Sequence, residues 1–278
     1  MVTFTNNLKT VLLLGLLTGL LVAVGGMMGR EFILPMLVIA TLLNFGIFFF
    51  SDKLAISAMR GRELDAASGG DLHRMLVQLS ERAGLPRPPR LYLSPHKAPN
   101  AFATGRSPSH AAVCFTQGAI DLLDPHELEG VMAHELAHIK NRDTLISTIA
   151  ATVAGVLAML AQWAFFLSPR GSDRVNPFIS IIVVMIAAFG AALIKAAISR
   201  SREFVADAHG ARIAGSPHGL ISALRKLEAY SRRIPLVQPN PAQNNLFIVE
   251  PFAGKTITDL FATHPPTEQR IASLLRAA

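Results

Sequence analysis

Two long apolar runs near the start of the chain limit its fold more than any other feature. Residues 10–29 and residues 32–50 are separated only by Arg30 and Glu31. As α-helices, each would span roughly the 30 Å hydrocarbon core of a bilayer. A cleaved signal peptide is the alternative interpretation of the first run, but that run is long for the role and the second follows at once. The sequence therefore predicts an N-terminal transmembrane hairpin over residues 1–50.

Two further apolar runs occur later, over residues 144–167 and 175–198. They form a second hairpin, which either spans the membrane or packs partly on protein, and their length and lack of charge favour spanning. If both runs cross, the polar regions on either side of them lie on the same side of the membrane and fold together. The expected divisions are a hairpin over 1–50, a catalytic segment over 51–142, a second apolar hairpin over 143–198 and a C-terminal catalytic segment over 199–278.

The distribution of charge predicts which side of the membrane the polar regions occupy. The chain of 278 residues is 51% hydrophobic and only 16% charged, yet its net charge is +7, and its mean hydropathy is +0.39. The basic residues flank apolar runs, which favours a lipid bilayer over nucleic acid as the partner. The side shared by the polar regions carries Lys9, Lys53, Arg60, Arg62, Lys140, Arg142, Arg200 and Arg202, and the other side carries Arg30, Arg170 and Arg174. The positive-inside rule therefore predicts that the polar regions are cytoplasmic.

The segment after the first hairpin has an α+β pattern. An amphipathic helix is expected from about residue 70 to residue 83, and short strands over 90–93 and 111–116. The only cysteine, Cys114, lies in the second strand, so no internal disulfide is possible. We interpret it as a buried strand residue.

The stretch DPHELEGVMAHELAHIKNRD, residues 124–143, reads as one helix. Asp124 suits the N-cap, Pro125 the first helical position and Glu127 the third residue of a capping box. Inside it, His134 and His138 are four apart and share a face, so that both imidazoles can bind one ion. This is the HExxH pattern of zinc hydrolases. The alternative is a surface helix with unrelated histidines, but the small apolar residues before His134 indicate burial, and buried imidazoles need partners.

Catalytic zinc usually has three protein ligands and one open position. Glu203 and Asp207 follow the fourth run and lie four apart on one helical face. Glu203 is the candidate third ligand, and Asp207 can accept the remaining N–H of a ligating histidine. A solvated acidic pair beside arginines is the alternative interpretation. His209 is a second candidate ligand, although it lies off the Glu203 face.

The segments HELAH (134–138), EFVAD (203–207) and THPPTEQR (263–270), together with NAFATG (100–105), resemble the M48 family of membrane zinc metallopeptidases. The resemblance covers nearly the whole chain. It implies a mainly α membrane protein with four apolar helices and a small α+β, zincin-like cytoplasmic catalytic domain. Similarity to bacterial members implies a multi-pass protein of the inner (cytoplasmic) membrane.

The resemblance also assigns roles to residues. His134, His138 and Glu203 would bind one Zn²⁺ per chain, Glu135 would be the general base, and Asp207 would orient His134. His264 would stabilise the oxyanion and Arg270 would pair with an acidic group of the site, although a turn before a last helix also explains the THPP segment. The edge strand that receives substrate would comprise Asn100, Ala101, Phe102 and Ala103.

The function implied is zinc-dependent endopeptidase activity on misfolded or damaged membrane proteins, in quality control and the stress response. Two alternatives remain open, a processing protease for lipidated peptides and a non-catalytic zinc-binding scaffold. An intact Glu135 argues against the scaffold, because a structural site has no use for a base. The sequence does not predict an oligomeric state or a cleavage preference.

Overall fold

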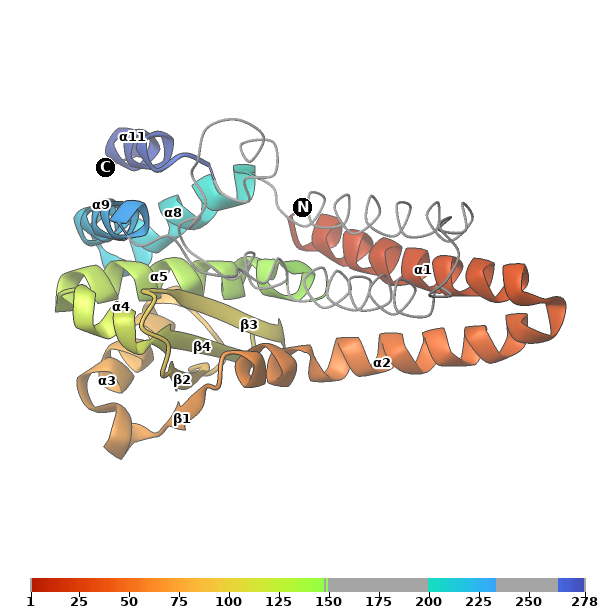
Figure 1. Ribbon diagram of the computed structural model, residues 1–278. Helices are drawn as coiled ribbons and strands as arrows, with labels where there is room; N and C mark the ends of the chain where they lie inside the picture. Colours follow the sequence, from red (N-terminus) through yellow and green to blue (C-terminus); the bar gives the residue numbers. More distant parts are fainter. Residues whose placement is uncertain (1, 148, 150–199, 234–264, 278) are drawn as a thin grey trace.

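The computed structural model describes residues 2–147, 149, 200–233 and 265–277. The fold is mainly helical, with one sheet of four strands (Figure 1). The third and fourth apolar runs lie outside the described residues, apart from the first few positions of the third. The described elements are α1 (Val2–Met28), η1 (Arg30–Phe32), α2 (Ile33–Ala58), β1 (Arg62–Leu64), α3 (Ala66–Ala83), β2 (Arg90–Ser94), β3 (Ala101–Ser107), β4 (His110–Thr116), α4 (Gln117–Leu122), α5 (Pro125–Asn141), α8 (Arg200–Ala214), α9 (His218–Arg233) and α11 (Thr267–Ala277).

The first two helices form the predicted antiparallel hairpin, which extends away from the sheet (Figure 1). Residues Asn6–Gly26 and Arg30–Phe50 are long and apolar enough to cross a membrane, and only 28% and 11% of them are buried. Their outward faces carry leucine, valine and phenylalanine side chains. Asn44 of α2 joins the two helices by donating its amide to the Leu14 carbonyl at 3.1 Å and to the Thr18 hydroxyl at 2.8 Å. Such exposed apolar helices suit lipid rather than water.

The sheet has the strand order β1-β2-β4-β3, with β2 and β4 parallel and the other pairs antiparallel. Strands β2 and β4 agree closely with the predicted strands. Strand β1 was not predicted, because three residues are too short to show an alternating pattern. Cys114 is fully buried in β4, as expected, and burial raises the pKa of its thiol to about 12.

Helix α3 begins four residues before the predicted start. Asp65 accepts a hydrogen bond from the Ser68 backbone N–H at 2.7 Å, and the Ser68 hydroxyl accepts one from the Asp65 N–H. This capping box starts the helix at Ala66. Gly70, with φ +48°, kinks the helix near the residue where the prediction placed its start.

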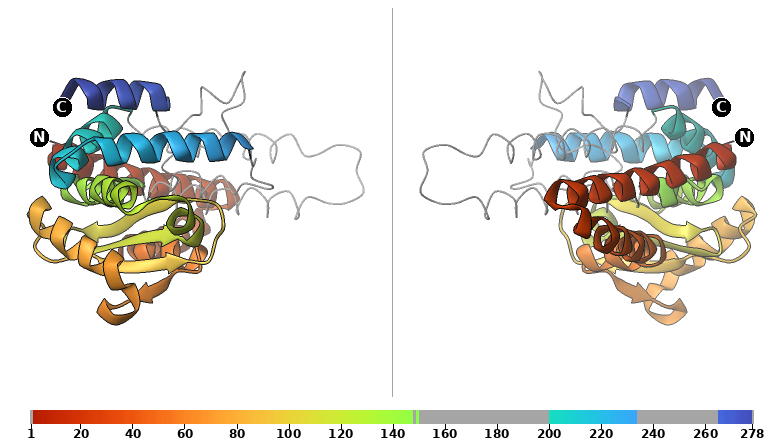
Figure 2. Two further views of the ribbon diagram at one scale, coloured as in Figure 1. Left: turned by 90° about the vertical axis from the view of Figure 1, so that its left-hand side faces the viewer. Right: turned by 90° about the vertical axis from the view of Figure 1, so that its right-hand side faces the viewer.

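Helix α5 lies at the centre of the molecule. The sheet packs on one side of it, and α8 and α9 pack on the other (Figure 2). Its buried face contributes Val131, Met132, Leu136 and Ile139 to the main hydrophobic core. A helix covered on both sides has few exposed positions, so polar residues on it are buried unless partners are provided.

Glycine allows α9 to approach α5 closely. A Cβ added at Gly130 would lie 2.3 Å from the backbone nitrogen of Leu220, and one added at Gly219 would lie 2.3 Å from the carbonyl oxygen of His126. Neither contact involves a flexible side chain, so the backbones themselves would have to move apart.

We expect Gly130→Ala to lower the thermal unfolding temperature of the detergent-solubilised protein, with a loss of about 1–3 kcal/mol from overpacking. The matched control is Gly46→Ala in α2, where an added Cβ meets nothing within 4 Å. The control should be neutral or slightly stabilising, because alanine is the better helix former. Equal unfolding temperatures for Gly130→Ala and the parent would contradict the close approach of α9.

Candidate active site

Helix α5 presents the HExxH segment. Asp124 caps it, accepting hydrogen bonds from the backbone N–H groups of His126 and Glu127 at 3.0 Å, while the Glu127 carboxylate accepts from the Asp124 N–H at 2.9 Å. This is the capping box expected from the sequence. Two turns later, His134 and Glu135 are only 2% and 5% exposed. The histidines are therefore not part of a solvent-facing helix surface.

Helix α8 crosses α5 at His134. A Cβ added at Gly210 would lie 2.9 Å from the His134 Cα, so glycine permits the close crossing. Glu203, Asp207 and Gly210 are spaced four and three apart and share one helical face. That face carries both acids to the histidines, and their side chains are 7% and 1% exposed. The surface-pair interpretation of these acids is therefore wrong.

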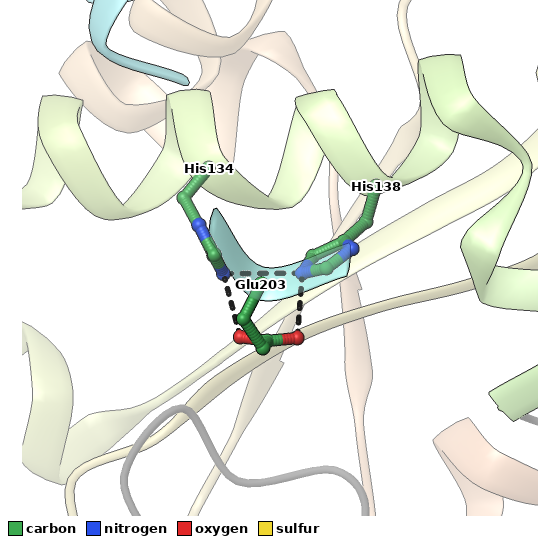
Figure 3. Close-up of side chains that lie close together, drawn as sticks. All are labelled: His134, His138 and Glu203. Carbon is green, nitrogen blue, oxygen red and sulfur yellow. Dashed lines mark hydrogen bonds and ion pairs between the residues drawn. The ribbon is translucent and has the colours of Figure 1, made fainter. Parts of the chain in front are cut away.

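Three side chains converge on one point (Figure 3). The Nε2 atoms of His134 and His138 lie 3.1 Å apart. Glu203 places Oε2 3.7 Å from the first nitrogen and Oε1 3.4 Å from the second. Ligands of a tetrahedral zinc ion, at bonds of roughly 2.0–2.1 Å, are separated by about 3.3 Å. The two-imidazole, one-carboxylate set and its spacing therefore fit a catalytic zinc ion.

Asp207 contacts the Nδ1 side of His134, and Arg270 pairs with Asp207. The Nδ1 atom of His134 lies 3.0 Å from Asp207 Oδ1. Arg270 donates to both oxygens of the same carboxylate, at 2.6 and 2.9 Å, and a further guanidinium nitrogen lies 3.7 Å from Glu203. Burial raises the pKa of Asp207, but Arg270 and His134 outweigh burial and lower that pKa to about 2. Asp207 therefore remains a carboxylate that can accept a hydrogen bond from the Nδ1–H group of His134.

Asp143 plays the corresponding part for His138, and sequence reasoning missed it. Its Oδ2 lies 3.1 Å from the His138 Nδ1. Helix α5 ends at Asn141, and its C-cap Arg142 is left-handed, with φ +59°, before helical structure resumes at Asp143. This break brings Asp143 to His138, five residues earlier, a spacing that an unbroken helix would not bring together. The sequence predicted one helix over residues 124–143 that includes Asp143, whereas α5 ends at Asn141 because Arg142 leaves the helical conformation.

The charges of the site act on its titrating groups. Burial lowers the pKa of His138, but the carboxylates of Glu203, Asp143 and Glu135 outweigh burial and raise it to about 9. Burial raises the pKa of Glu135, and the nearby His134 and His138 oppose that shift. The backbone N–H of Ala103 also acts on the Glu135 carboxylate as a hydrogen-bond donor.

That donor belongs to β3, which is an edge strand of the described sheet. The strand begins at Ala101, one residue after Asn100. Asn100 donates its N–H to the Thr116 hydroxyl at 2.8 Å, and its carbonyl accepts from the Thr116 N–H at 2.9 Å. Phe102 is buried at 3% exposure. Glu135 thus lies between the histidine pair and the edge of the sheet.

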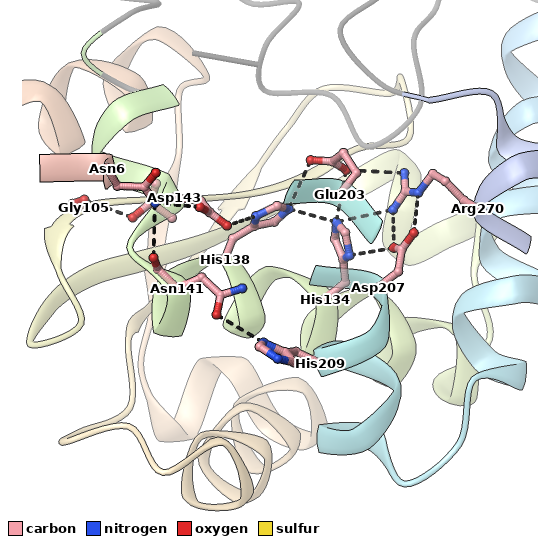
Figure 4. A network of polar contacts seen from close by, with 11 residues as sticks. Asn6, Gly105, His134, His138, Asn141, Asp143, Glu203, Asp207, His209 and Arg270 are labelled. Carbon is pink, nitrogen blue, oxygen red and sulfur yellow. Dashed lines mark hydrogen bonds and ion pairs between the residues drawn. The ribbon is translucent and has the colours of Figure 1, made fainter. Parts of the chain in front are cut away.

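The described cluster does not include two of the candidate residues. His209 is not in the cluster; its Nδ1 lies 3.1 Å from the Asn141 side-chain oxygen, on the other face of α8 (Figure 4). His264 lies outside the described residues, so the oxyanion role expected for it stays a prediction.

This fold and this site define a metallopeptidase, and comparisons with known proteins agree. The model of "Peptidase family M48" matches residues 66–278. A "Protease HtpX homolog" of Sulfurihydrogenibium sp. is 48% identical, covering 97% of this chain and 95% of the relative. Another, from Pyrococcus furiosus, is 45% identical, covering 97% and 95%. The chain belongs to peptidase family M48.

A solved structure shares the fold at low sequence identity. It is Ste24p of S. mikatae, with a TM-score of 0.52 and 16% identity, covering 98% of this chain and 66% of that one. The similarity includes nearly the whole chain, so the hairpin and the catalytic unit belong to one shared architecture.

We expect Arg270→Ala to destabilise the protein by about 3–5 kcal/mol, because Asp207 would be left as an unpaired buried charge. The matched control is Arg276→Ala, an exposed position on the same helix. Thermal unfolding measures both. An unfolding temperature for Arg270→Ala equal to that of Arg276→Ala would contradict a buried ion pair.

Proposed function

We propose that this protein is a zinc endopeptidase in which His134, His138 and Glu203 hold the metal. The observation that carries the proposal is the convergence of three ligand atoms, within 4.8 Å of one another, beside the carboxylate of Glu135. Zinc in such a set supplies a Lewis acid and lowers the pKa of a bound water toward roughly 7.

The residues of the chain supply the remaining steps. Glu135 accepts the proton of the attacking water and later delivers it to the leaving amine. Its environment suits both, since burial raises its pKa above that of an ordinary glutamate. Asp207 and Asp143 hold the two imidazoles with their Nε2 atoms toward the metal. His264 is proposed, from the family resemblance, to stabilise the oxyanion.

Substrate is proposed to bind as an added strand on β3. An edge strand can add an extended peptide through the backbone groups on its outer side. Ala103 directs its N–H toward Glu135, and Ala101, two residues away, directs its backbone groups the same way. A peptide paired there would pass directly beside the base and the metal ligands.

We propose a multi-pass location in the bacterial inner membrane with the site at the cytoplasmic face. The first helix begins beside α5, and the turn that holds Arg30 lies at the far end of the hairpin (Figure 1). Lys9 and Lys53 are near the catalytic end. That asymmetry supports a cytoplasmic catalytic unit. Substrates next to the membrane, misfolded or damaged membrane proteins among them, are the proposed class.

We expect Glu135→Gln to retain one zinc per chain and to lose peptidase activity on casein by at least about 100-fold, because the amide cannot accept a proton. Metal analysis and the casein assay, with and without chelator, test both parts. Retained cleavage would refute the base. A parent protein that binds zinc but cleaves neither casein nor lipidated peptides would instead support the scaffold.

We expect Glu203→Ala to weaken zinc binding by about 100-fold or more, because one of three ligands is lost. The control is His209→Ala, which removes a side chain of α8 that contacts Asn141 and not the metal cluster. A competition titration against a chromophoric chelator measures the affinities. Unchanged affinity for Glu203→Ala would place the third ligand elsewhere.

The same titration should depend on pH. The His138 pKa of about 9 means that, below this pH, zinc displaces a proton from the metal-free site. We therefore expect the apparent zinc affinity to fall about tenfold for each pH unit below 9. An affinity that does not change between about pH 7 and pH 9 would contradict this prediction.

A further inference from the structure

Asn6 is a buried amide at the start of the first apolar helix, where the candidate membrane span begins. Its side chain is only 3% exposed. The Nδ2 atom donates to Asp143 Oδ1 at 3.0 Å and lies 3.4 Å from the carbonyl oxygen of Asn141 (Figure 4). An amide from the hairpin thus reaches the C-terminal end of the metal-binding helix, across a separation of 137 residues.

Asp143 is shared between this amide and the metal site. Its Oδ1 accepts from Asn6, and its Oδ2 lies 3.1 Å from the Nδ1 of His138. The carboxylate is 3% exposed, so water has little access to replace either partner. A buried carboxylate with one donor on each oxygen has a fixed orientation, and that orientation fixes the ring of His138.

We propose that Asn6 is a positioning residue for the metal centre, acting through Asp143 on His138. The inference rests on the proposed function of the site. The first apolar helix is then more than an anchor, because it donates a hydrogen bond to Asp143. Without that bond, the carboxylate that orients His138 would be held through one oxygen only. Catalytic competence therefore depends on the docking of the hairpin against α5.

Packing alone does not require this amide. The start of the third apolar run, at Ile146 and Ile149, is buried among leucines of α1, namely Leu13, Leu17 and Leu21. These apolar contacts hold the hairpin whether or not position 6 is polar. The alternative, that Asn6 only stabilises helix packing, therefore makes a different prediction from the positioning role.

The test uses the full-length protein in detergent with Asn6→Leu, which keeps a similar volume and removes the donor. We expect zinc affinity to fall about 10–100-fold, as for other groups that orient a metal ligand. We also expect a changed absorption spectrum of the Co²⁺-substituted protein, and a lower kcat with little change in KM. The metal-free unfolding temperature should fall only modestly, because Asp143 Oδ1 loses its donor while Oδ2 keeps its contact with His138.

The matched control is Asn7→Leu, at the adjacent exposed position of the same helix. It should equal the parent in zinc affinity and in the Co²⁺ spectrum. Asn6→Ser, which retains a small hydroxyl, should give an intermediate loss and guards against a folding defect in Asn6→Leu.

A double-mutant cycle with Asp143→Ala tests whether Asn6 acts on the metal site through Asp143. If Asn6 acts through Asp143, Asn6→Leu should cause no further loss of zinc affinity once Asp143 is absent. Additive losses, or a zinc affinity of Asn6→Leu equal to that of the parent, would overturn the proposal. A parent protein that binds no zinc and cleaves no casein would instead overturn the proposed function, so the two failures are distinguishable.

Discussion

The arrangement of the rest of the site depends on two imidazole nitrogens that lie 3.1 Å apart. Each histidine has its Nδ1 beside an aspartate, which favours the tautomer whose Nε2 carries a lone pair. Two lone pairs at this distance repel unless a metal ion or a proton lies between them. The rings are held in this arrangement by the buried carboxylates of Asp207, Asp143 and Glu203.

Those carboxylates come from distant parts of the chain, and each needs a local device to reach the histidines. Glu203 and Asp207 approach because Gly210 lets α8 touch the backbone of α5. Asp143 approaches because Arg142 adopts a left-handed conformation, at a cost of roughly 1–2 kcal/mol for a residue with a side chain. Such strain is tolerated where the surrounding contacts require the conformation. Here the contacts are those of the metal site itself.

Sequence reasoning predicted the local parts of this arrangement well. The cap of α5, the shared face of the histidines and the i, i+4 pairing of Glu203 with Asp207 follow from helical spacing alone. Asp143 and Asn6 did not follow, because one depends on the break in the helix at Arg142 and the other on a contact across 137 residues. Periodicity carries no information about either. Strand β1 and the kink at Gly70 were missed for the related reason that both are single irregularities rather than repeats.

Charge gives an independent reason for a divalent ion. Among the described residues of the site, four carboxylates are buried. Those of Asp143, Glu203 and Asp207 belong to the network in Figure 4, and that of Glu135 interacts electrostatically with His134, His138 and Glu203. Two guanidinium groups face them. Arg270 is paired with Asp207, and the pKa of Arg202 is lowered by burial, which Asp143 and Glu203 oppose.

Four negative charges against two positive ones leave an excess of two, in a region where uncompensated charge costs several kcal/mol per ion. The excess acts on His138, because the carboxylates of Glu203, Asp143 and Glu135 raise its pKa to about 9 against the effect of burial. A divalent cation held by His134, His138 and Glu203 would neutralise this excess. The charge of the site therefore favours the same occupant as the spacing of its three ligand atoms.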